Sequence, residues 1–230
     1  MGDRAAKDAL FNGLAAVARA LGNGRRAELV DVLEQGERSV DELAAEVGQS
    51  VANTSQHLQY LLRTGLVRTR RDGNRIFYTL ASQRVGELWA ALREVAQEHV
   101  AELDQLAAAY LGDRSRLDTV TRDELAARLR DGDVVVLDVR PEPEYRAGHI
   151  AGAVSLPVGE LTRRLRDLSA DRTVVAYCRG TFCVFADDAV RELGRRGYRV
   201  ARLEEGFPEW ARAGLPVEHS REGAVVRLGR

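Results

Sequence analysis

Two cysteines separated by four residues are the side chains of this chain best suited to covalent chemistry. Cys178 and Cys183 are its only cysteines, and they enclose the loop Arg179-Gly180-Thr181-Phe182. A strand-like run, Thr173 to Ala176, precedes this loop, and a helical pattern from Val184 to Arg196 follows it. A short loop between a strand and a helix turns backbone N–H groups inward. These donors, the helix N-terminus and Arg179 would stabilise a thiolate, so we expect a lowered pKa and a nucleophilic sulfur at Cys178.

We interpret Cys178 as a nucleophile for covalent sulfur chemistry. Cys178 would carry sulfur as a persulfide, and Arg179 could steer an anionic donor toward it. Cys183 could attack that persulfide, expel hydrosulfide and leave a disulfide, or keep the sulfur in a longer bridge. The alternative is that both cysteines are small buried apolar side chains. For Cys183 this alternative stays open, because the end of such a loop requires only a small side chain.

Composition limits the classes of protein that need to be considered. The chain has 230 residues, a formal net charge of −1 and 45% hydrophobic residues, which suits one large domain or two small ones. Two cysteines this close together form no disulfide framework. We find no signal-peptide core at the N-terminus and no apolar run of membrane-spanning length, so we expect a cytoplasmic protein without a membrane partner. Near-neutral charge leaves room only for a local basic patch.

The elements that would position the cysteines alternate between helix and strand. Thr121 and Glu124 form a capping box that opens a helix ending at Arg130. The apolar run Val134–Leu137 is typical of a strand buried on both faces. Further elements are expected at 159–168 (helix), 173–177 (strand), 184–196 (helix), 199–203 (strand) and 207–213 (helix). This order predicts an α/β domain with a parallel sheet covered by helices on both faces. Cys178 then lies at the carboxyl end of a strand, where sites of such folds occur.

The first half of the chain has a different pattern. Helices are expected at 8–21, 26–34, 41–47 and 51–64, and Ser39 with Glu42 forms a capping box before the third. Two strand-like runs, 66–71 and 75–80, flank the turn Asp72-Gly73-Asn74. The order predicts a mainly α, α+β winged helix-turn-helix. A last, long helix is expected from Ser82 to Tyr110.

Polar and basic side chains gather on the fourth helix and on the hairpin. Five arginines and one acidic residue lie between Arg63 and Arg75. Amide, imidazole and guanidinium groups on one helix face suit base edges in a major groove, and arginines at a hairpin tip suit phosphates. The alternative is an ordinary solvated face. The predicted DNA-binding residues are Ser50, Asn53, Ser55, Gln56, His57, Arg63, Arg68, Arg70, Arg71 and Arg75.

The region from about Asp8 to Tyr110 resembles an ArsR-type winged-helix repressor. The resemblance rests on Ser55-Gln56-His57-Leu58, Gly65-Leu66-Val67, and Arg71-Asp72-Gly73 leading to Tyr78-Thr79-Leu80. It implies a homodimer that binds a palindromic operator in double-stranded DNA and represses transcription. An apolar stripe on the long helix would pair with the first helix and a second subunit: Leu88, Leu92, Val95, His99, Leu103, Leu106 and Tyr110.

Many members of that family sense metals, but the expected ligands are missing here. The helix 41–47, where the family's thiolate site lies, contains no cysteine. On the long helix, His99 and Glu102 match half of the family's other site, and two ligands per chain make a poor metal site. We therefore predict no metal site and no cofactor, and we interpret His99 as an interface residue.

The region from about Leu117 to Val217 resembles a rhodanese domain. The resemblance rests on Asp138-Val139-Arg140, Gly148-His149-Ile150, the six-residue loop from Cys178 to Cys183, and Glu204-Glu205-Gly206 with Trp210. It implies a Cys178 persulfide formed from a sulfane-sulfur donor such as thiosulfate, polysulfide or another persulfide. We interpret Asp138, Arg140 and His149 as residues that fix the surrounding loops through buried polar bonds.

These observations predict two domains and leave three functions open. The predicted boundaries are a DNA-binding and dimerisation domain at 1–111, a linker at 112–117 and a rhodanese-like domain at 118–230. The first hypothesis is a transcriptional repressor that senses reactive sulfur or redox species through Cys178. The alternative is a sulfurtransferase, acting through Cys178, that is tethered to a DNA-binding module. The third is a constitutive repressor with a vestigial second domain.

Overall fold

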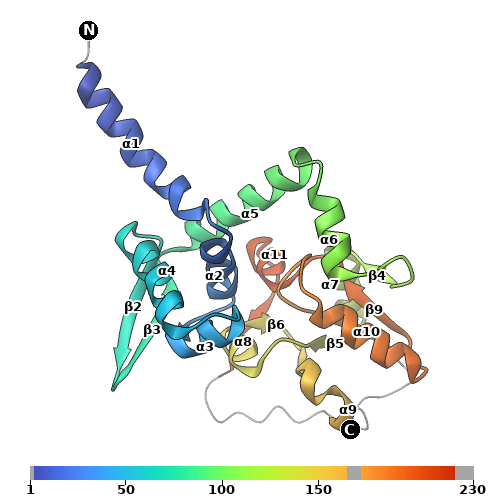
Figure 1. Ribbon diagram of the computed structural model, residues 1–230. Coiled ribbons are helices and arrows are strands. Elements are labelled where there is room, and N and C mark those ends of the chain that lie inside the picture. Colours follow the sequence, from blue (N-terminus) through green and yellow to red (C-terminus); the bar gives the residue numbers. More distant parts are fainter. Residues whose placement is uncertain (1–2, 165–171, 221–230) are drawn as a thin grey trace. The chain divides into compact units, whose positions relative to one another are not determined.

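The computed structural model describes residues 3–164 and 172–220, and the chain forms two compact units (Figure 1). The first comprises Met1–Ala101 and the second Glu102–Arg230. Helix α6 (Leu103–Leu111), which the sequence assigned to the first domain, thus groups with the second unit. No helix among the described residues is long and apolar enough to cross a membrane.

The first unit has the predicted helix-turn-helix and wing. Its helices are α1 (Arg4–Leu21), α2 (Gly24–Glu34), α3 (Val40–Glu46), α4 (Val51–Arg63) and α5 (Gln83–His99). Its strands are β1 (Arg38–Ser39), β2 (Val67–Asp72) and β3 (Arg75–Leu80). The capping box before α3 is formed, since Ser39 accepts from the Glu42 N–H and Glu42 accepts from the Ser39 N–H.

The wing is a three-stranded antiparallel sheet in the order β1-β3-β2. Asp72 pairs with Arg75 at its tip, and Gly73 takes the positive φ of 56° that the two-residue turn requires. Behind the wing, Leu29, Leu58 and Tyr78 belong to one buried core. This core fixes the angle at which α4 presents its outer face.

The prediction of one long helix from Ser82 to Tyr110 is wrong, because this segment forms two helices. Helix α5 ends at His99, Val100 is extended (φ −94°, ψ 97°), and α6 begins at Leu103. No glycine or proline marks the interruption, so the side-chain pattern alone did not show it.

The second unit has a five-stranded parallel sheet in the order β4-β9-β8-β5-β7. These strands are β4 (Thr119–Val120), β5 (Val134–Asp138), β7 (Val154–Ser155), β8 (Thr173–Tyr177) and β9 (Val200–Leu203), while β6 (His149–Ile150) pairs with β10 (Val217–Glu218). The helices are α7 (Arg122–Asp131), α8 (Glu142–Ala147), the 3-10 turn η1 (Val158–Glu160), α9 (Leu161–Arg164), α10 (Phe185–Arg195) and α11 (Phe207–Arg212). Of the helix predicted at 159–168, residues 165–168 lie outside the described residues.

Alternate residues of the central strands build two cores, one on each face of the sheet. On β8, Val174 and Ala176 pack with α9 and α10, and Cys178 extends the same row. Val175 and Tyr177 pack on the opposite face with residues of α7 and α11. Because successive residues of a strand point to opposite faces and both faces are buried, the predicted strands are continuous apolar runs. The same alternation directs Cys178 to the face that α10 covers.

Candidate functional site

The cysteine loop begins where β8 ends, because Cys178 directly follows Tyr177. The N–H of Cys183 donates to the carbonyl of Gly180 over 3.1 Å, which closes the loop just before α10. Cys178 is 2% exposed and Cys183 is half-buried, and both are free thiols. The strand therefore holds the first cysteine while the turn brings the second back to it.

The Cys178 thiol donates to two carbonyls of its own loop, that of Cys183 over 3.7 Å and that of Gly180 over 3.9 Å. Each thiol shifts the pKa of the other, and nearby backbone N–H groups lower both: those of Gly180 and Ala186 act on Cys178, and those of Arg179 and Phe185 act on Cys183. The amide donors expected from the sequence therefore act on two sulfur atoms and not on one.

Charge is distributed within this pair differently from what the sequence suggested. The hydrogen bond from Cys178, helped by the backbone N–H of Arg179, lowers the pKa of Cys183. Burial raises the pKa of Cys178 well above its usual value, and the neighbouring Cys183 raises it further. The expected lowering of the Cys178 pKa is therefore wrong, because desolvation outweighs the amide donors. Cys183 is the thiol that ionises first.

Arg179 points away from open solvent and into the protein. Its Nε lies 3.0 Å from both carboxylate oxygens of Glu144, its Nη2 lies 2.5 Å from one of them, and the Glu144 side chain is fully buried. The guanidinium also lies 5.2 Å from the centre of the Phe185 ring. An arginine held in this way anchors the loop to α8, so the geometry does not offer it as a steering group for donors.

The first half of the loop rests directly on another backbone segment. The N–H of Phe207 donates to the carbonyl of Cys178 over 3.0 Å. A Cβ added at Gly206 would lie 2.3 Å from the Gly180 nitrogen and 2.4 Å from the carbonyl carbon of Arg179. Only glycine allows this approach, so residues 178–180 have no room to move in that direction.

A buried polar network supports the strand ends beside the loop. Arg140 bonds Asp138 and the carbonyl of Gly148, and Tyr177 donates to Asp138 over 2.6 Å. His149 bonds the carbonyl of Tyr145 over 2.8 Å through its Nδ1. All these side chains are buried, which agrees with the interpretation that Asp138, Arg140 and His149 fix loops.

The predicted DNA-binding residues of α4 lie around its N-terminus and along one side. Ser50 caps the helix by accepting from the N–H of Asn53, whose side chain donates to Gln49 over 2.7 Å. Gln56 and Arg63 are exposed. Asn53, Ser55 and His57 are half-buried. Val51, in the first turn of α4, is 45% exposed.

The wing presents its four predicted arginines to solvent. Arg68, Arg70, Arg71 and Arg75 are all exposed on β2 and β3. Arg70 differs from the others because it bonds both oxygens of Glu37 and one oxygen of Asp72. Its charge is thus already paired with carboxylates of the same unit.

Comparison with known proteins decides the family. Residues 23–69 match the model described as bacterial regulatory protein, arsR family, and residues 121–213 match the rhodanese-like domain. The HTH-type transcriptional regulator Rv0324 of Mycobacterium tuberculosis is 47% identical over 97% of this chain and 96% of its own length. The chain belongs to the ArsR-type transcriptional regulators that carry a rhodanese domain.

Two further similarities cover one half each. A sulfurtransferase of Allochromatium vinosum is 36% identical over 43% of this chain and 92% of its own length. The solution structure of the homodimeric winged helix-turn-helix DNA-binding fragment of Mb0332 from Mycobacterium bovis is 41% identical, covers 44% of this chain and 93% of the fragment, and has a TM-score of 0.41.

The residues around the cysteines that sequence reasoning missed are those that hold the loop in place. Gly206 appeared only as part of a family pattern, Glu144 had no role assigned to it, and nothing marked Arg114, which contacts the loop from the segment after α6. A buried carboxylate and a glycine contact have no local sequence signal, because both depend on segments distant in the chain. The regulator's cysteine loop is therefore more tightly fixed than its sequence suggests.

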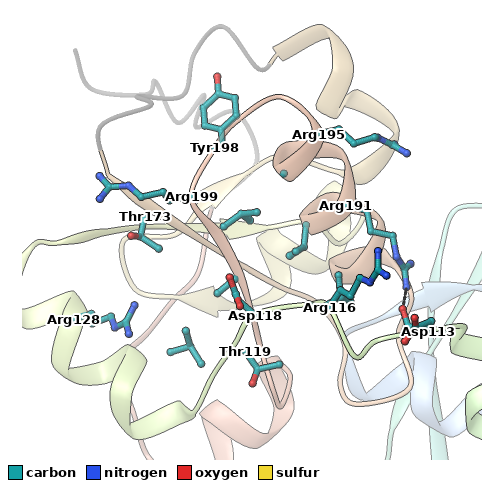
Figure 2. A pocket seen from close by; sticks show the side chains of 16 residues that line it. Asp113, Arg116, Asp118, Thr119, Arg128, Thr173, Arg191, Arg195, Tyr198 and Arg199 are labelled. Carbon is teal, nitrogen blue, oxygen red and sulfur yellow. Dashed lines mark hydrogen bonds between the residues drawn. The ribbon is translucent and has the colours of Figure 1, made fainter.

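A cavity of about 1170 Å³ lies at the opposite end of the sheet from Cys178, at the start of β8 and β9 (Figure 2). Its lining includes Arg128, Arg195 and Arg199. In Figure 2 the side chains of Arg195 and Arg199 extend to opposite sides. The residues that line the cavity include none of the cysteine loop at 178–183.

Proposed function

We propose that this ArsR-type regulator is a repressor whose affinity for DNA is controlled by sulfur chemistry at Cys178 and Cys183. The observation that carries the proposal is the tight loop that brings the two thiols together: the Cys183 N–H donates to the carbonyl of Gly180 over 3.1 Å, and the Cys178 thiol donates to the carbonyl of Cys183 over 3.7 Å. The winged-helix half contains no cysteine, so a thiol-directed signal has to enter through this loop.

DNA contact is assigned to α4 and the wing. Helix α4 would enter the major groove with Ser50, Asn53, Ser55, Gln56, His57 and Arg63, while Arg68, Arg71 and Arg75 contact phosphates. Arg70 contributes after exchanging its carboxylate partners.

A homodimer on a palindromic operator is supported by apolar side chains that the first unit leaves exposed. Leu10, Phe11 and Leu14 on α1 are 59–64% exposed, and Leu88, Leu92 and Val95 on α5 are 39–57% exposed. Surfaces of this kind mark protein–protein contacts. A second copy of the same chain is the occupant that the family resemblance implies.

The first chemical step places sulfur on Cys178. As its sulfur attacks the sulfane sulfur of the donor, the Cys178 proton passes to the Cys183 thiolate that already accepts it. The bond between the sulfane sulfur and the rest of the donor breaks, and the donor leaves with the electron pair, as sulfite in the case of thiosulfate. Cys178 then carries a persulfide.

The second step uses Cys183. After losing its proton to solvent, its thiolate attacks the inner sulfur of the Cys178 persulfide, the S–S bond breaks, and hydrosulfide leaves. The two thiols have then been oxidised to a disulfide, and the sulfane sulfur has been reduced to sulfide. A bridge that retains one sulfur atom requires a second equivalent of donor.

The alternative function is a sulfurtransferase tethered to a DNA-binding module. The similarity to the sulfurtransferase of Allochromatium vinosum favours it. The resolving thiol argues for the sensor, because Cys183 would trap each persulfide before an external acceptor could take it.

The test measures sulfur and DNA on the same samples. Intact mass and affinity for a duplex selected from a random library are compared before and after polysulfide, for wild type, C178S and C183S. We expect the mass to fall by two hydrogen atoms or to rise by sulfur in wild type, with at least about tenfold weaker binding, which is about 1.4 kcal/mol. C178S can form no disulfide and should stay bound, and C183S should stop at the persulfide. Unchanged affinity together with rapid transfer to cyanide would favour the sulfurtransferase.

A further inference from the structure

Arg114 lies in the segment that leads from α6 to β4, and its side chain reaches the cysteine loop. Its Nη1 donates to the carbonyl of Thr181 over 2.7 Å and its Nη2 to the carbonyl of Cys183 over 3.2 Å. Its Nε donates to Asp187 over 2.5 Å. All three guanidinium nitrogens are thus bonded to the second half of the loop and to the first turn of α10.

The bond to Asp187 holds the Arg114 side chain in its present position. Asp187 is fully buried, and its other arginine contact is Arg202, 3.3 Å away. Among the described residues, Asp187 without Arg114 would keep only the Arg202 contact, which is not a hydrogen bond, and a buried carboxylate that loses its hydrogen-bonded cation is destabilised. Arg114 is therefore held in place as long as the loop keeps its present shape.

The backbone around Arg114 is fastened to the same helix. Arg191 of α10 donates to the carbonyl of Asp113 over 3.1 Å. The N–H of Leu117 donates to the carbonyl of Arg114 over 3.0 Å, and the Leu117 side chain packs on the core that includes Cys178. Residues 113–117, predicted as a plain linker, are thus an ordered strap on α10.

The carbonyl of Cys183 connects this strap to the reacting sulfur. It accepts from Arg114, and the Cys178 thiol lies 3.7 Å from the same oxygen. A persulfide anion at Cys178 would replace a weak donor by a negative charge next to that oxygen. A disulfide would draw the Cys183 backbone toward Cys178. Both products disturb the bond that Arg114 makes.

The loop can give way only on the side of Arg114. Residues 178–180 are blocked by Gly206 and bonded to Phe207, and Arg179 is anchored by Glu144. Movement caused by modification is therefore confined to residues 181–183, whose carbonyls Arg114 holds.

We propose that Arg114 is the positioning residue that reads the state of the Cys178–Cys183 pair and passes it to the 113–117 strap. The strap continues through α6 into the chain that forms the DNA-binding unit. The proposal rests on the proposed function, since it supplies the physical link that such a sensor requires. Because such coupling is reciprocal, a change in the 113–117 strap must also change the stability of the cysteine loop before any sulfur is bound.

The test compares R114Q and R114K with R116Q, a matched control because Arg116 is exposed in the same segment and makes none of these contacts within the described part of the chain. Hydrogen exchange of residues 112–118 is followed in full-length protein, reduced and modified by polysulfide. In wild type and R116Q, we expect modification to speed exchange at least about tenfold and to weaken duplex binding equally. In R114Q the segment should exchange fast already, and modification should change duplex binding less than about twofold, with the mass change intact.

Two further measurements distinguish a failure of the proposed function from a failure of the role proposed for Arg114. If polysulfide leaves wild-type mass unchanged, the proposed function fails, and diamide, which takes two electrons and two protons from the thiols to form the disulfide, still tests Arg114. If R114Q does not fold, R114K decides. Lysine can pair with Asp187, but all its donors lie on one nitrogen, so it cannot span the three acceptors that Arg114 bonds from three separate nitrogens. R114K too should lose the response. A response in R114K or R114Q equal to that of R116Q would overturn the role of Arg114.

Discussion

At the level of single residues, the cysteine pair behaves as one titrating unit. Each thiol shifts the pKa of the other, upward for Cys178 and downward for Cys183. Burial of Cys178 and the amides around Cys183 decide that the charge resides on Cys183. The nucleophile expected from the sequence is thus the weaker acid of the two thiols, and in the proposed function Cys183 acts as its base.

Replacing Cys178 should make Cys183 a weaker acid. In C178A the donor that lowers the pKa of Cys183 is gone, so the pH midpoint of Cys183 alkylation by iodoacetamide should rise. Because the folded-state pKa of Cys183 is lowered, its stabilising contribution is present above the unfolded pKa and is lost as the pH falls through the folded value. The measurement is the alkylation rate by intact mass between about pH 6 and about pH 10. T181A serves as control, and an unchanged midpoint in C178A would exclude the hydrogen bond.

The Arg179–Glu144 pair should be structural. R179M leaves the fully buried Glu144 without its arginine, so we expect a loss of about 3–5 kcal/mol in the stability of the second unit, measured by hydrogen exchange of β8 amides. The double variant R179M/E144L should recover most of that loss. R146Q breaks the exposed pair with Glu142 and should cost less than about 0.5 kcal/mol. Equal effects of R179M and R146Q would contradict the assignment.

At the level of elements, the contact between the cysteine loop and the start of α11 sets the shape of the loop. Gly206 precedes α11, and its missing side chain lets two backbone segments touch. The loop geometry therefore depends on a residue well separated from it in sequence.

G206A should displace the loop. The added Cβ would overlap backbone atoms of Arg179 and Gly180, which cannot rotate away as a side chain can. We expect a loss of about 1–3 kcal/mol and faster thiol labelling of Cys178. G159A is the control, because a Cβ at Gly159 meets no atom within 4 Å. Wild-type labelling rates in G206A would show that the loop is not held by this contact.

Sequence reasoning predicted elements well and contacts between distant segments poorly. Both capping boxes form, at Ser39 and Thr121, because their signal is local to four residues. The apolar run of β5 identified a central strand because burial on both faces is visible in composition. The break at Val100, the partner of Arg179 and the reach of Arg114 depend on packing between segments far apart in sequence, which no periodicity records.

The wing arginines should differ in their effect on the salt dependence of DNA affinity, because in the described part of the first unit only Arg70 of these is paired with carboxylates. R71Q and R75Q should each lower the slope of log affinity against log salt by about 0.9 for each phosphate that the substituted side chain no longer neutralises. R70Q should change the slope less, because Arg70 is already bonded to Glu37 and Asp72. Duplex titrations over a range of salt concentrations measure this. A larger change in slope for R70Q than for R71Q would show that the Glu37 pair opens on DNA.

At the level of the whole molecule, each half lacks something that the other supplies. The winged-helix unit contains no thiol, and the rhodanese-like unit provides the only two. Coupling between them has to run along the covalent chain or through a second copy, and the ordered strap at 113–117 makes the covalent route physically concrete. The exposed apolar residues of α1 and α5 make self-association the other whole-molecule property open to test.

V95E should weaken the dimer. Val95 is 57% exposed on α5, on the same stripe as Leu88 and Leu92, and a carboxylate there would be buried without a partner in a paired surface. We expect sedimentation equilibrium to show a dimer for wild type and mainly monomer for V95E, with loss of binding to a palindromic duplex and retained binding of a sulfur atom at Cys178. Q97E, on the exposed side chain two positions along α5, is the matched control and should remain dimeric. A V95E dimer as stable as that of Q97E would place the self-association surface elsewhere. A buried carboxylate from each subunit in an apolar contact has to weaken the dimer.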